Sequence, residues 1–238
     1  MLFAGADSGE NKQMQENTLQ LEVEQHLQGV PFGAQALYRR LEEHHQETAA
    51  HARRTARYAM QLALESGRFN DAQVADIWLG ALLHDIGKIA VPLAILDKPG
   101  GLSAPEWEVI RCHTLWGEQL IKPFVSDHPI VLEAVRSEHE RFDGRGYPDG
   151  LSGKWIPDSA RIIMVCDTFD AVTHARSYRP GRSPEKAIEI LIAGAGSQFD
   201  PYWVGIAIRA WASSKITPPA ILREGQSTRE SATHFEAA

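Results

Sequence analysis

The feature of this sequence that most restricts its fold is the helical spacing of its apolar residues, which recurs along most of the chain. Apolar side chains return every three or four residues, and no segment keeps the alternation of a half-buried β-strand. We therefore predict an all-α fold. The predicted helices span residues 34–43, 48–66, 71–84, 104–121, 129–138, 159–173, 184–193 and 201–212.

Capping signals agree with this periodicity. Asp71 and Ser103 are typical N-cap residues, and Pro184 and Pro201 stand at the first position of predicted helices. Two connections rich in glycine and proline are predicted to be loops, at residues 89–103 and 143–157.

The chain is predicted to form one main domain. A length of 238 residues, of which 43% are hydrophobic, suffices for one sizeable core. An imperfect apolar stripe over residues 13–28 predicts a short leading helix, which packs either on the domain or on a second subunit. We expect a tail and this helix at residues 1–33, the domain at 34–212 and a flexible tail at 213–238.

Charge and cysteine content exclude several classes of function. A net charge of -7 provides no basic field for a long nucleic acid or an anionic membrane surface, whereas bound divalent cations could still attract a small anionic substrate. Cys112 and Cys166 form no paired motif, which fits a reducing compartment. With no membrane span and no secretory signal in the sequence, we expect a cytoplasmic protein.

The candidate site centres on His84 and Asp85, adjacent residues at the end of an apolar predicted helix. An imidazole nitrogen and carboxylate oxygens suit divalent metals, and a carboxylate can bridge two ions. Because one such dipeptide is common by chance, a histidine at a helix end beside a solvated aspartate remains an alternative.

Further potential ligands lie on other predicted helices. Glu47 and His51 are four residues apart and hence on one helical face, while His113, His139 and Asp167 lie on or beside three more segments. Each of these residues could instead have no role in metal binding, for example as an exposed histidine or as a histidine at an interface. Asp167 fits that alternative least, because its neighbours are apolar and a buried, unpaired carboxylate is costly.

Several motifs occur together and in a fixed order: ETAAH (47–51), HDIGK (84–88), KPGGL (98–102), His113, DGRGYP (143–148), ARI (160–162), DTFD (167–170), YR (178–179) and FDP (199–201). In this order they resemble the HD superfamily of phosphohydrolases, and more closely its HD-GYP branch, the bacterial cyclic di-GMP phosphodiesterases. The resemblance covers about residues 47–210.

The resemblance implies an HD-domain-like helical bundle that holds two or three divalent metal ions, iron or manganese. Asp85, bridging two ions, and Lys88, contacting the scissile phosphate, would be the catalytic residues. The implied metal ligands are Glu47, His51, His84, Asp85, His113, His139 and Asp167. The implied substrate contacts are Lys88, Gly146, Tyr147, Asp170, Arg176 and Arg179.

The sequence departs from the family pattern at three places. The family has two adjacent histidines before the Gly-Tyr-Pro loop, but here Glu138 precedes His139. Glu138 could still coordinate and favour harder ions, or the second metal could be weakened and activity lost. His45 replaces an acid that often contacts the nucleotide, and residues 175–179 are a loosened form of a family motif that keeps Arg176 and Arg179.

The implied function is hydrolysis of cyclic di-GMP to linear pGpG, with GMP as an open further product. The cations would activate a water for attack on phosphorus and offset the charge that builds up on the phosphate oxygens. Two alternatives stay open: a phosphohydrolase of another nucleotide, and a degenerate domain that binds a cyclic dinucleotide or a partner protein without cleavage. A homodimer is a further expectation.

Overall fold

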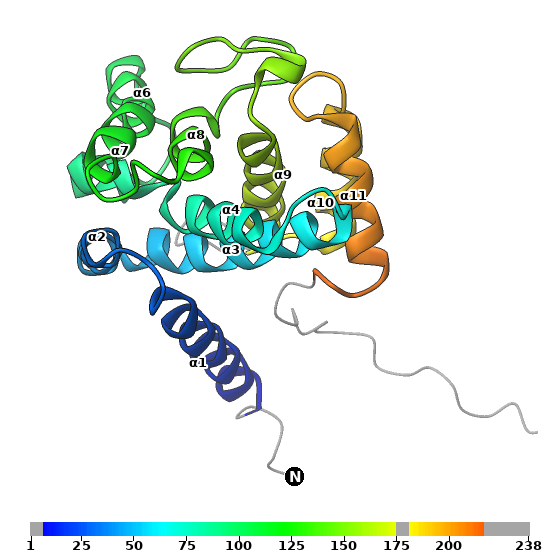
Figure 1. Ribbon diagram of the computed structural model, residues 1–238, viewed down its shortest axis with the longest axis horizontal. Coiled ribbons are helices and arrows are strands. Elements are labelled where there is room, and N and C mark those ends of the chain that lie inside the picture. The colour runs from blue at the N-terminus through cyan, green and yellow to red at the C-terminus, as the bar shows by residue number, and fades with distance from the viewer. Residues whose placement is uncertain (1–6, 175–180, 217–238) are drawn as a thin grey trace, which may run out of the picture.

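The computed structural model describes residues 7–174 and 181–216, which form a bundle of helices (Figure 1). Within these ranges no β-strand occurs, and Ala195 and Phe199 form an isolated bridge, so the all-α prediction is confirmed. None of the described helices is long and apolar enough to cross a membrane. The helices are α1 (Asp7–Leu27), α2 (Phe32–His44), α3 (Gln46–Ser66), α4 (Asp71–Leu83), η1 (Ile86–Ala90), α5 (Leu93–Leu96), α6 (Ala104–Arg111), α7 (His113–Ile121), α8 (Pro129–Ser137), η2 (Gly153–Trp155), α9 (Asp158–Thr173), α10 (Pro184–Gly194) and α11 (Pro201–Ala212).

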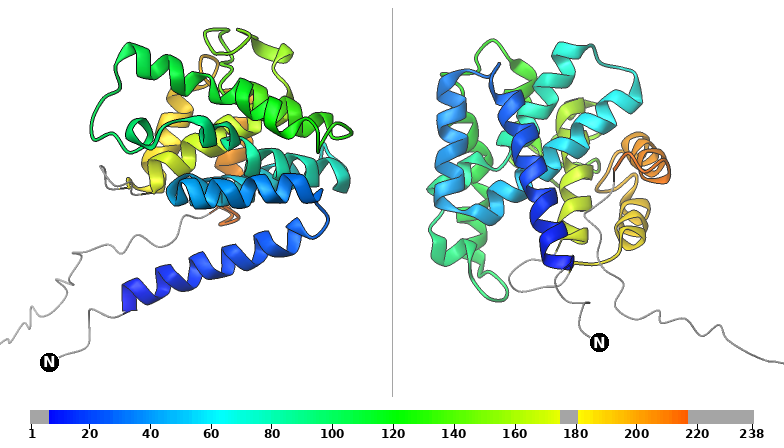
Figure 2. Two further views of the ribbon diagram at one scale, coloured as in Figure 1. Left: turned by 90° about the vertical axis from the view of Figure 1, so that its left-hand side faces the viewer. Right: turned by 90° about the horizontal axis from the view of Figure 1, so that it is seen from below.

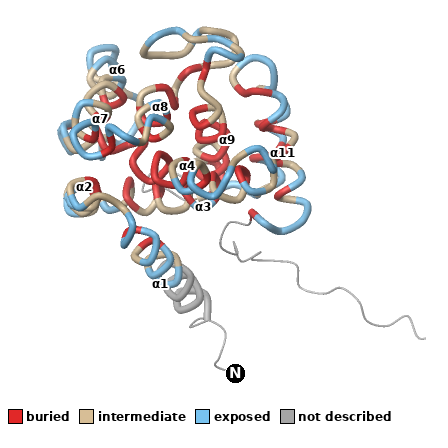
Figure 3. Tube along the Cα trace, viewed as in Figure 1, coloured by how far each residue is buried: buried red, intermediate tan, exposed pale blue. Residues whose placement is uncertain are grey.

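The core lies between α3, α4, α8 and α9. Helix α3 packs along α4 and α9, and α8 covers α4. Figure 1 shows α6 and α7 to one side of α8 and α9, with α10 and α11 on the other side. Buried positions concentrate on these central helices (Figure 3). The bundle therefore brings segments that are distant in sequence to one shared interior.

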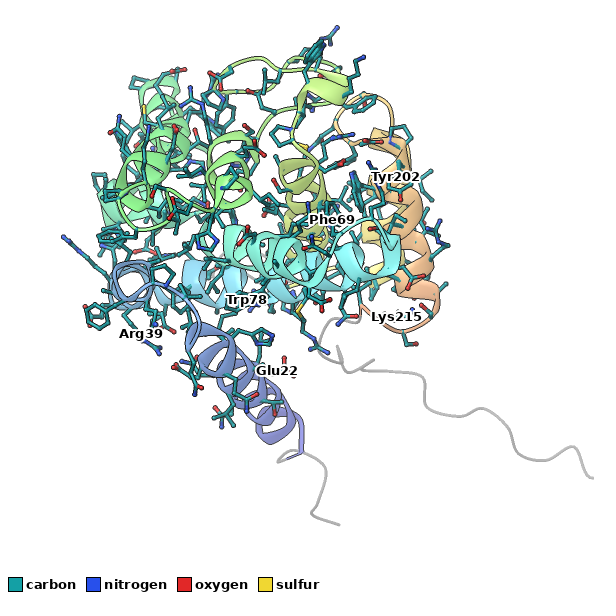
Figure 4. All side chains as sticks on the ribbon, in the orientation of Figure 1. Glu22, Arg39, Phe69, Trp78, Tyr202 and Lys215 are labelled. Carbon is teal, nitrogen blue, oxygen red and sulfur yellow. The ribbon has the colours of Figure 1, made fainter. Side chains whose placement is uncertain are left out.

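The leading helix α1 is longer than predicted, since it begins at Asp7, and it runs along one face of the bundle (Figure 2). Val23 and Leu27 are buried in the core. The ring of His26 stacks on Trp78 at 4.9 Å, and Glu24 forms an ion pair with Arg39 of α2; Figure 4 labels Trp78 and Arg39 beside α1. We expected α1 to pack either on the domain or on a second subunit, and in the structure it packs on its own domain.

Helix ends differ from the prediction in two instructive places. Asn70, not Asp71, is the N-cap of α4: its side chain accepts from the backbone N–H of Gln73 at 2.9 Å, and the Gln73 side chain accepts from the N–H of Asn70 at 3.0 Å. The single helix predicted over residues 104–121 is interrupted at Cys112, which separates α6 from α7.

The chain after α11 continues to pack on the bundle for a few residues. Ile216 is buried, and Lys215 forms an ion pair with Glu65 of α3. The first residues assigned to a flexible tail therefore lie against the domain. The rest of that predicted tail, residues 217–238, and residues 1–6 lie outside the described part of the chain.

Candidate metal centre

The end of α4 presents His84 with a defined orientation. Its Nδ1 lies 2.7 Å from the carbonyl oxygen of Ala81, and because a carbonyl only accepts, Nδ1 must carry the proton. The other ring nitrogen, Nε2, therefore faces the interior, 3.4 Å from Asp85 and 3.6 Å from Glu138. His84 and Asp85 are both 1% exposed.

His113 repeats this arrangement at the start of α7. Its Nδ1 lies 2.5 Å from the carbonyl oxygen of Ile110, in the turn where α6 ends, and its Nε2 lies 3.1 Å from Oε1 of Glu138. The break at Cys112 thus matters for the site, because α7 starts at the histidine itself. Two histidines from separate helices point the same nitrogen at one acidic interior.

A glycine contact holds these two segments together. A methyl group added at Gly87 in η1 would lie 1.9 Å from the carbonyl oxygen of His113 and 2.7 Å from the backbone nitrogen of Gly117. Only glycine permits so close an approach of two backbones. The glycine of the HDIGK motif therefore lets Asp85 and His113 reach the same space.

His51 of α3 joins the interior from the other side, between two aspartates of α9. Its Nε2 lies 2.8 Å from Oδ1 of Asp167, and its Nδ1 lies 2.7 Å from Oδ2 of Asp170. Arg54 donates to both oxygens of Asp170, and Nδ1 of His174 lies 2.9 Å from Oδ1. Asp170 is 1% exposed and holds a histidine, and its expected contact with substrate stays a prediction.

Arg54 and His174 were missed by sequence reasoning. Arg54 follows His51 by three residues and shares its helical face, and His174 follows Asp170 by four, so their spacing was an available signal. Together they explain why Asp170 stays ionised: burial opposes ionisation, but the nearby Arg54 and the hydrogen bonds from His174 and His51 outweigh it and lower the pKa of Asp170.

Seven of the eight predicted ligands fall into three overlapping groups, in each of which donor atoms lie within 4.8 Å of one another. The groups are His51–His84–Asp167, His113–Glu138–His139 and His84–Asp85–Glu138. Glu47 belongs to none of these three groups, although it lies one turn before His51 on α3. The other seven predicted ligands converge, and Glu138 belongs to two groups.

The interior fits a cation on independent grounds. Oδ1 of Asp85 and Oε2 of Glu138 are buried and have no hydrogen-bond partner in the described part of the chain. Leaving such oxygens unpaired is costly. Burial disfavours the charged ring of His84, but Glu138 and Asp85 outweigh it and raise the pKa of His84 to about 10. The donor set of imidazole nitrogens and carboxylate oxygens suits borderline and hard divalent metals.

Lys88 and Tyr147 lie around this interior. Nζ of Lys88 lies 2.7 Å from Oδ2 of Asp85, and its side chain is 22% exposed, so the ammonium group lies between the buried site and solvent. The ring of Tyr147, expected to stack on guanine, here stacks on His139 at 4.8 Å, with the guanidinium group of Arg111 4.7 Å from its ring centroid. Arg111, on α6, is a cation near the site that sequence reasoning missed.

Three predicted substrate contacts remain. A methyl group added at Gly146 would lie 2.5 Å from the carbonyl oxygen of His139 and 2.3 Å from the backbone nitrogen of Arg141. Gly146 therefore lets the loop pack on the segment that carries His139, and its expected contact with substrate stays a prediction. Arg176 and Arg179 lie outside the described residues.

His45, the second departure from the family pattern, has a local role. Its Nδ1 accepts from the backbone N–H of Thr48 at 3.1 Å and so caps α3, and its Nε2 lies 2.9 Å from Oδ1 of Asp97. An imidazole thus replaces the usual short polar cap at the start of the helix that carries His51.

Comparison with known proteins identifies relatives over the region that holds this centre. The HD domain family matches residues 35–202. The 3'3'-cGAMP-specific phosphodiesterase 2 of Vibrio cholerae serotype O1 is 36% identical over 172 residues, which cover 72% of this chain and 33% of that protein. The cyclic di-GMP phosphodiesterase response regulator RpfG of Xanthomonas campestris pv. campestris is 40% identical over 164 residues, covering 68% of this chain and 43% of that protein. The chain thus spans less than half the length of these relatives.

Solved structures support the same fold. A cyclic GMP-AMP specific phosphodiesterase of V. cholerae superimposes with a TM-score of 0.58 at 16% identity, covering 79% of this chain and 50% of that chain. Bd1817, an HDG"Y"P protein of Bdellovibrio bacteriovorus, gives 0.57 at 20% identity, covering 69% and 52%. At these identities the likeness concerns the fold alone, and it confirms the predicted HD-domain-like bundle.

Proposed function

Because this chain belongs to the HD domain family, we propose that its buried centre hydrolyses a phosphodiester bond of a cyclic dinucleotide, with cyclic di-GMP as substrate and linear pGpG as first product. The observation that carries the proposal is the shared orientation of His84 and His113. In both, a backbone carbonyl fixes Nδ1 and leaves Nε2 facing buried carboxylates that have unpaired oxygens. This arrangement is typical of a metal centre rather than of a packed core.

The proposed cofactors are two divalent ions, iron or manganese. His51, His84 and Asp167 would hold one side, His113 and His139 the other, and Asp85 would serve both. Glu47 is the weakest member of the predicted ligand set, because it stands outside the three donor groups. Bound cations supply Lewis acidity toward a phosphate oxygen and a water molecule.

The chain's own residues would perform the remaining steps. Lys88, at the edge of the buried site, would donate to a non-bridging phosphate oxygen and offset charge as the water oxygen bonds to phosphorus. The bond from phosphorus to the 3'-oxygen then breaks, and that oxygen is protonated in exchange for the proton that the attacking water gives up to solvent. His51 stays oriented throughout, because Asp170 accepts its Nδ1 proton.

A direct assay tests this proposal. Purified protein loaded with manganese or iron is incubated with cyclic di-GMP, and the products are separated by chromatography. We expect pGpG to accumulate, and the Asp85→Ala variant to bind less metal and release no product. Metal-loaded wild-type protein that leaves cyclic di-GMP intact would overturn the proposal.

A second candidate substrate is 3'3'-cGAMP, because the name of a V. cholerae relative specifies that substrate. Offering both dinucleotides separately and in competition decides between them by the ratio of kcat/KM. Tight binding of either dinucleotide without turnover would instead identify a receptor.

A further inference from the structure

The family pattern has a histidine where this chain has Glu138, and this difference changes how many sides of the centre the residue can contact. Glu138 is 2% exposed at the end of α8 and stands where the resemblance implies a histidine. An imidazole offers one inward nitrogen, whereas a carboxylate offers two oxygens. Whether those oxygens face one side of the site or both decides what this residue can do.

The two oxygens of Glu138 face different histidines. Oε1 lies 3.1 Å from Nε2 of His113, whereas Oε2 lies 3.6 Å from Nε2 of His84. Oε2 is also one of the buried oxygens without a hydrogen-bond partner in the described ranges. Oε2 therefore points into the site toward His84, while Oε1 contacts His113.

Asp85 repeats this geometry. Its Oδ1 lies 3.5 Å from Nε2 of His113, and its Oδ2 lies 3.4 Å from Nε2 of His84. The two imidazole nitrogens thus each face one oxygen of Asp85 and one oxygen of Glu138. Each of the two carboxylates therefore places one oxygen near His84 and the other oxygen near His113.

We propose that Glu138 is a second bridging ligand, so that this chain holds two metal ions joined by two carboxylates, Asp85 and Glu138. The inference rests on the proposed metal centre and extends it. Compared with a histidine, Glu138 adds one negative charge between the two ions, which offsets their mutual repulsion and favours harder cations. Glu47 lies outside the donor groups, and the seven ligands inside them suffice for two ions.

Removing a bridge has a different signature from removing a terminal ligand. Glu138→Gln is titrated with Mn²⁺ alone, and the two dissociation constants are measured by electron paramagnetic resonance, which also reports the magnetic coupling of the ion pair. We expect both constants to rise by about tenfold or more and the coupling to change. Loss at only one step with unchanged coupling would make Glu138 a terminal ligand and overturn the inference, as would wild-type binding at both steps.

Two further variants keep the test decisive. Glu133→Gln makes the same charge change on an exposed residue of α8 and should leave both constants unchanged. Glu138→His, with one inward nitrogen, should recover binding at one step but not the wild-type coupling; recovery of both would contradict a bridge. Circular dichroism confirms that each variant is folded. Absence of Mn²⁺ binding by the wild-type protein would instead reject the proposed function itself.

Discussion

Nδ1 of His51 lies 2.7 Å from Oδ2 of Asp170, and this contact turns the opposite nitrogen of the ring toward Asp167. The carboxylate that orients His51 comes from a residue 119 positions away in the sequence and is itself held by Arg54. An aspartate behind a ligand histidine fixes its tautomer and raises its basicity. The role of Asp170 is thus to position His51.

We predict that Asp170→Asn lowers metal affinity by about 10- to 100-fold while the protein stays folded. The amide keeps the shape of the side chain but loses the charge that favours a proton on Nδ1. Isothermal titration with Mn²⁺ measures the effect, and Asp127→Asn, which changes an exposed carboxylate, serves as the control. A folded Asp170→Asn protein with wild-type affinity would refute the positioning role.

The two glycine-to-alanine substitutions Gly87→Ala and Gly205→Ala should have opposite effects on stability. A methyl group at Gly87 meets the His113 backbone, so we expect a loss of about 2 kcal/mol or more and reduced metal content. A methyl group at Gly205, inside α11, meets nothing within 4 Å, so we expect a gain of roughly 0.5–1 kcal/mol. Urea denaturation measures both, and equal signs would contradict the close approach of η1 and α7.

Metal uptake should release protons. In the metal-free site the ring of His84 carries a second proton and is charged, because its pKa is raised to about 10. His51 also has a raised pKa, because Asp167 and Asp170 outweigh the effect of burial. A ligand imidazole must be neutral, so apparent affinity should rise with pH until about 10, by up to about tenfold per pH unit for each proton released. Calorimetry at pH 7.5 in buffers of different ionisation enthalpy counts these protons, and a buffer-independent heat would contradict the prediction.

The same raised pKa contributes to the stability of the metal-free chain. A folded-state pKa above the ordinary value of 6.5 means that protonated His84 stabilises the fold, fully so below about pH 6.5. We expect this contribution to be lost as pH rises through about 10. Denaturation of the metal-free protein should give a larger free energy of unfolding at pH 6 than at pH 10. With bound metal, which requires a neutral imidazole, we expect the opposite order.

Lys88→Ala should lower kcat by about 100- to 1,000-fold, the effect of removing one electrostatic donor to the transition state. Metal content should be retained, because the ammonium group of Lys88 has no lone pair to offer a metal ion. Lys186→Ala, which removes an exposed lysine of α10, is the matched control. A Lys88→Ala enzyme with wild-type kcat would exclude a contact with the scissile phosphate.

Much of the fold was predictable because helical spacing and caps are local signals. The core helices follow the predicted ranges within a few residues, and the HD domain match confirms the predicted family. The break at Cys112 was missed for a physical reason: one residue in a turn changes the direction of a helix but hardly alters the spacing of its apolar residues. That change of direction depends on tertiary packing.

The ligand types were predictable, but the roles of some carboxylates were not. Sequence spacing could not reveal which nitrogen of His51 each carboxylate would face, so the contact between Asp170 and Nδ1 of His51 was not predicted. Glu47 shares a helical face with His51 yet stays outside the donor groups, because a shared face does not fix where a side chain ends. Gly146 was assigned to substrate from its motif, and the sequence did not reveal that the loop also requires its lack of a side chain for close packing.

The backbone contact at Gly87 and Gly117 also determines how the centre would come apart. Asp85 and His113 meet only while η1 and α7 touch, so a state that kept its helices but loosened their packing would lose the site. Release of bound metal on warming would therefore report the melting of tertiary structure, ahead of any loss of helix content.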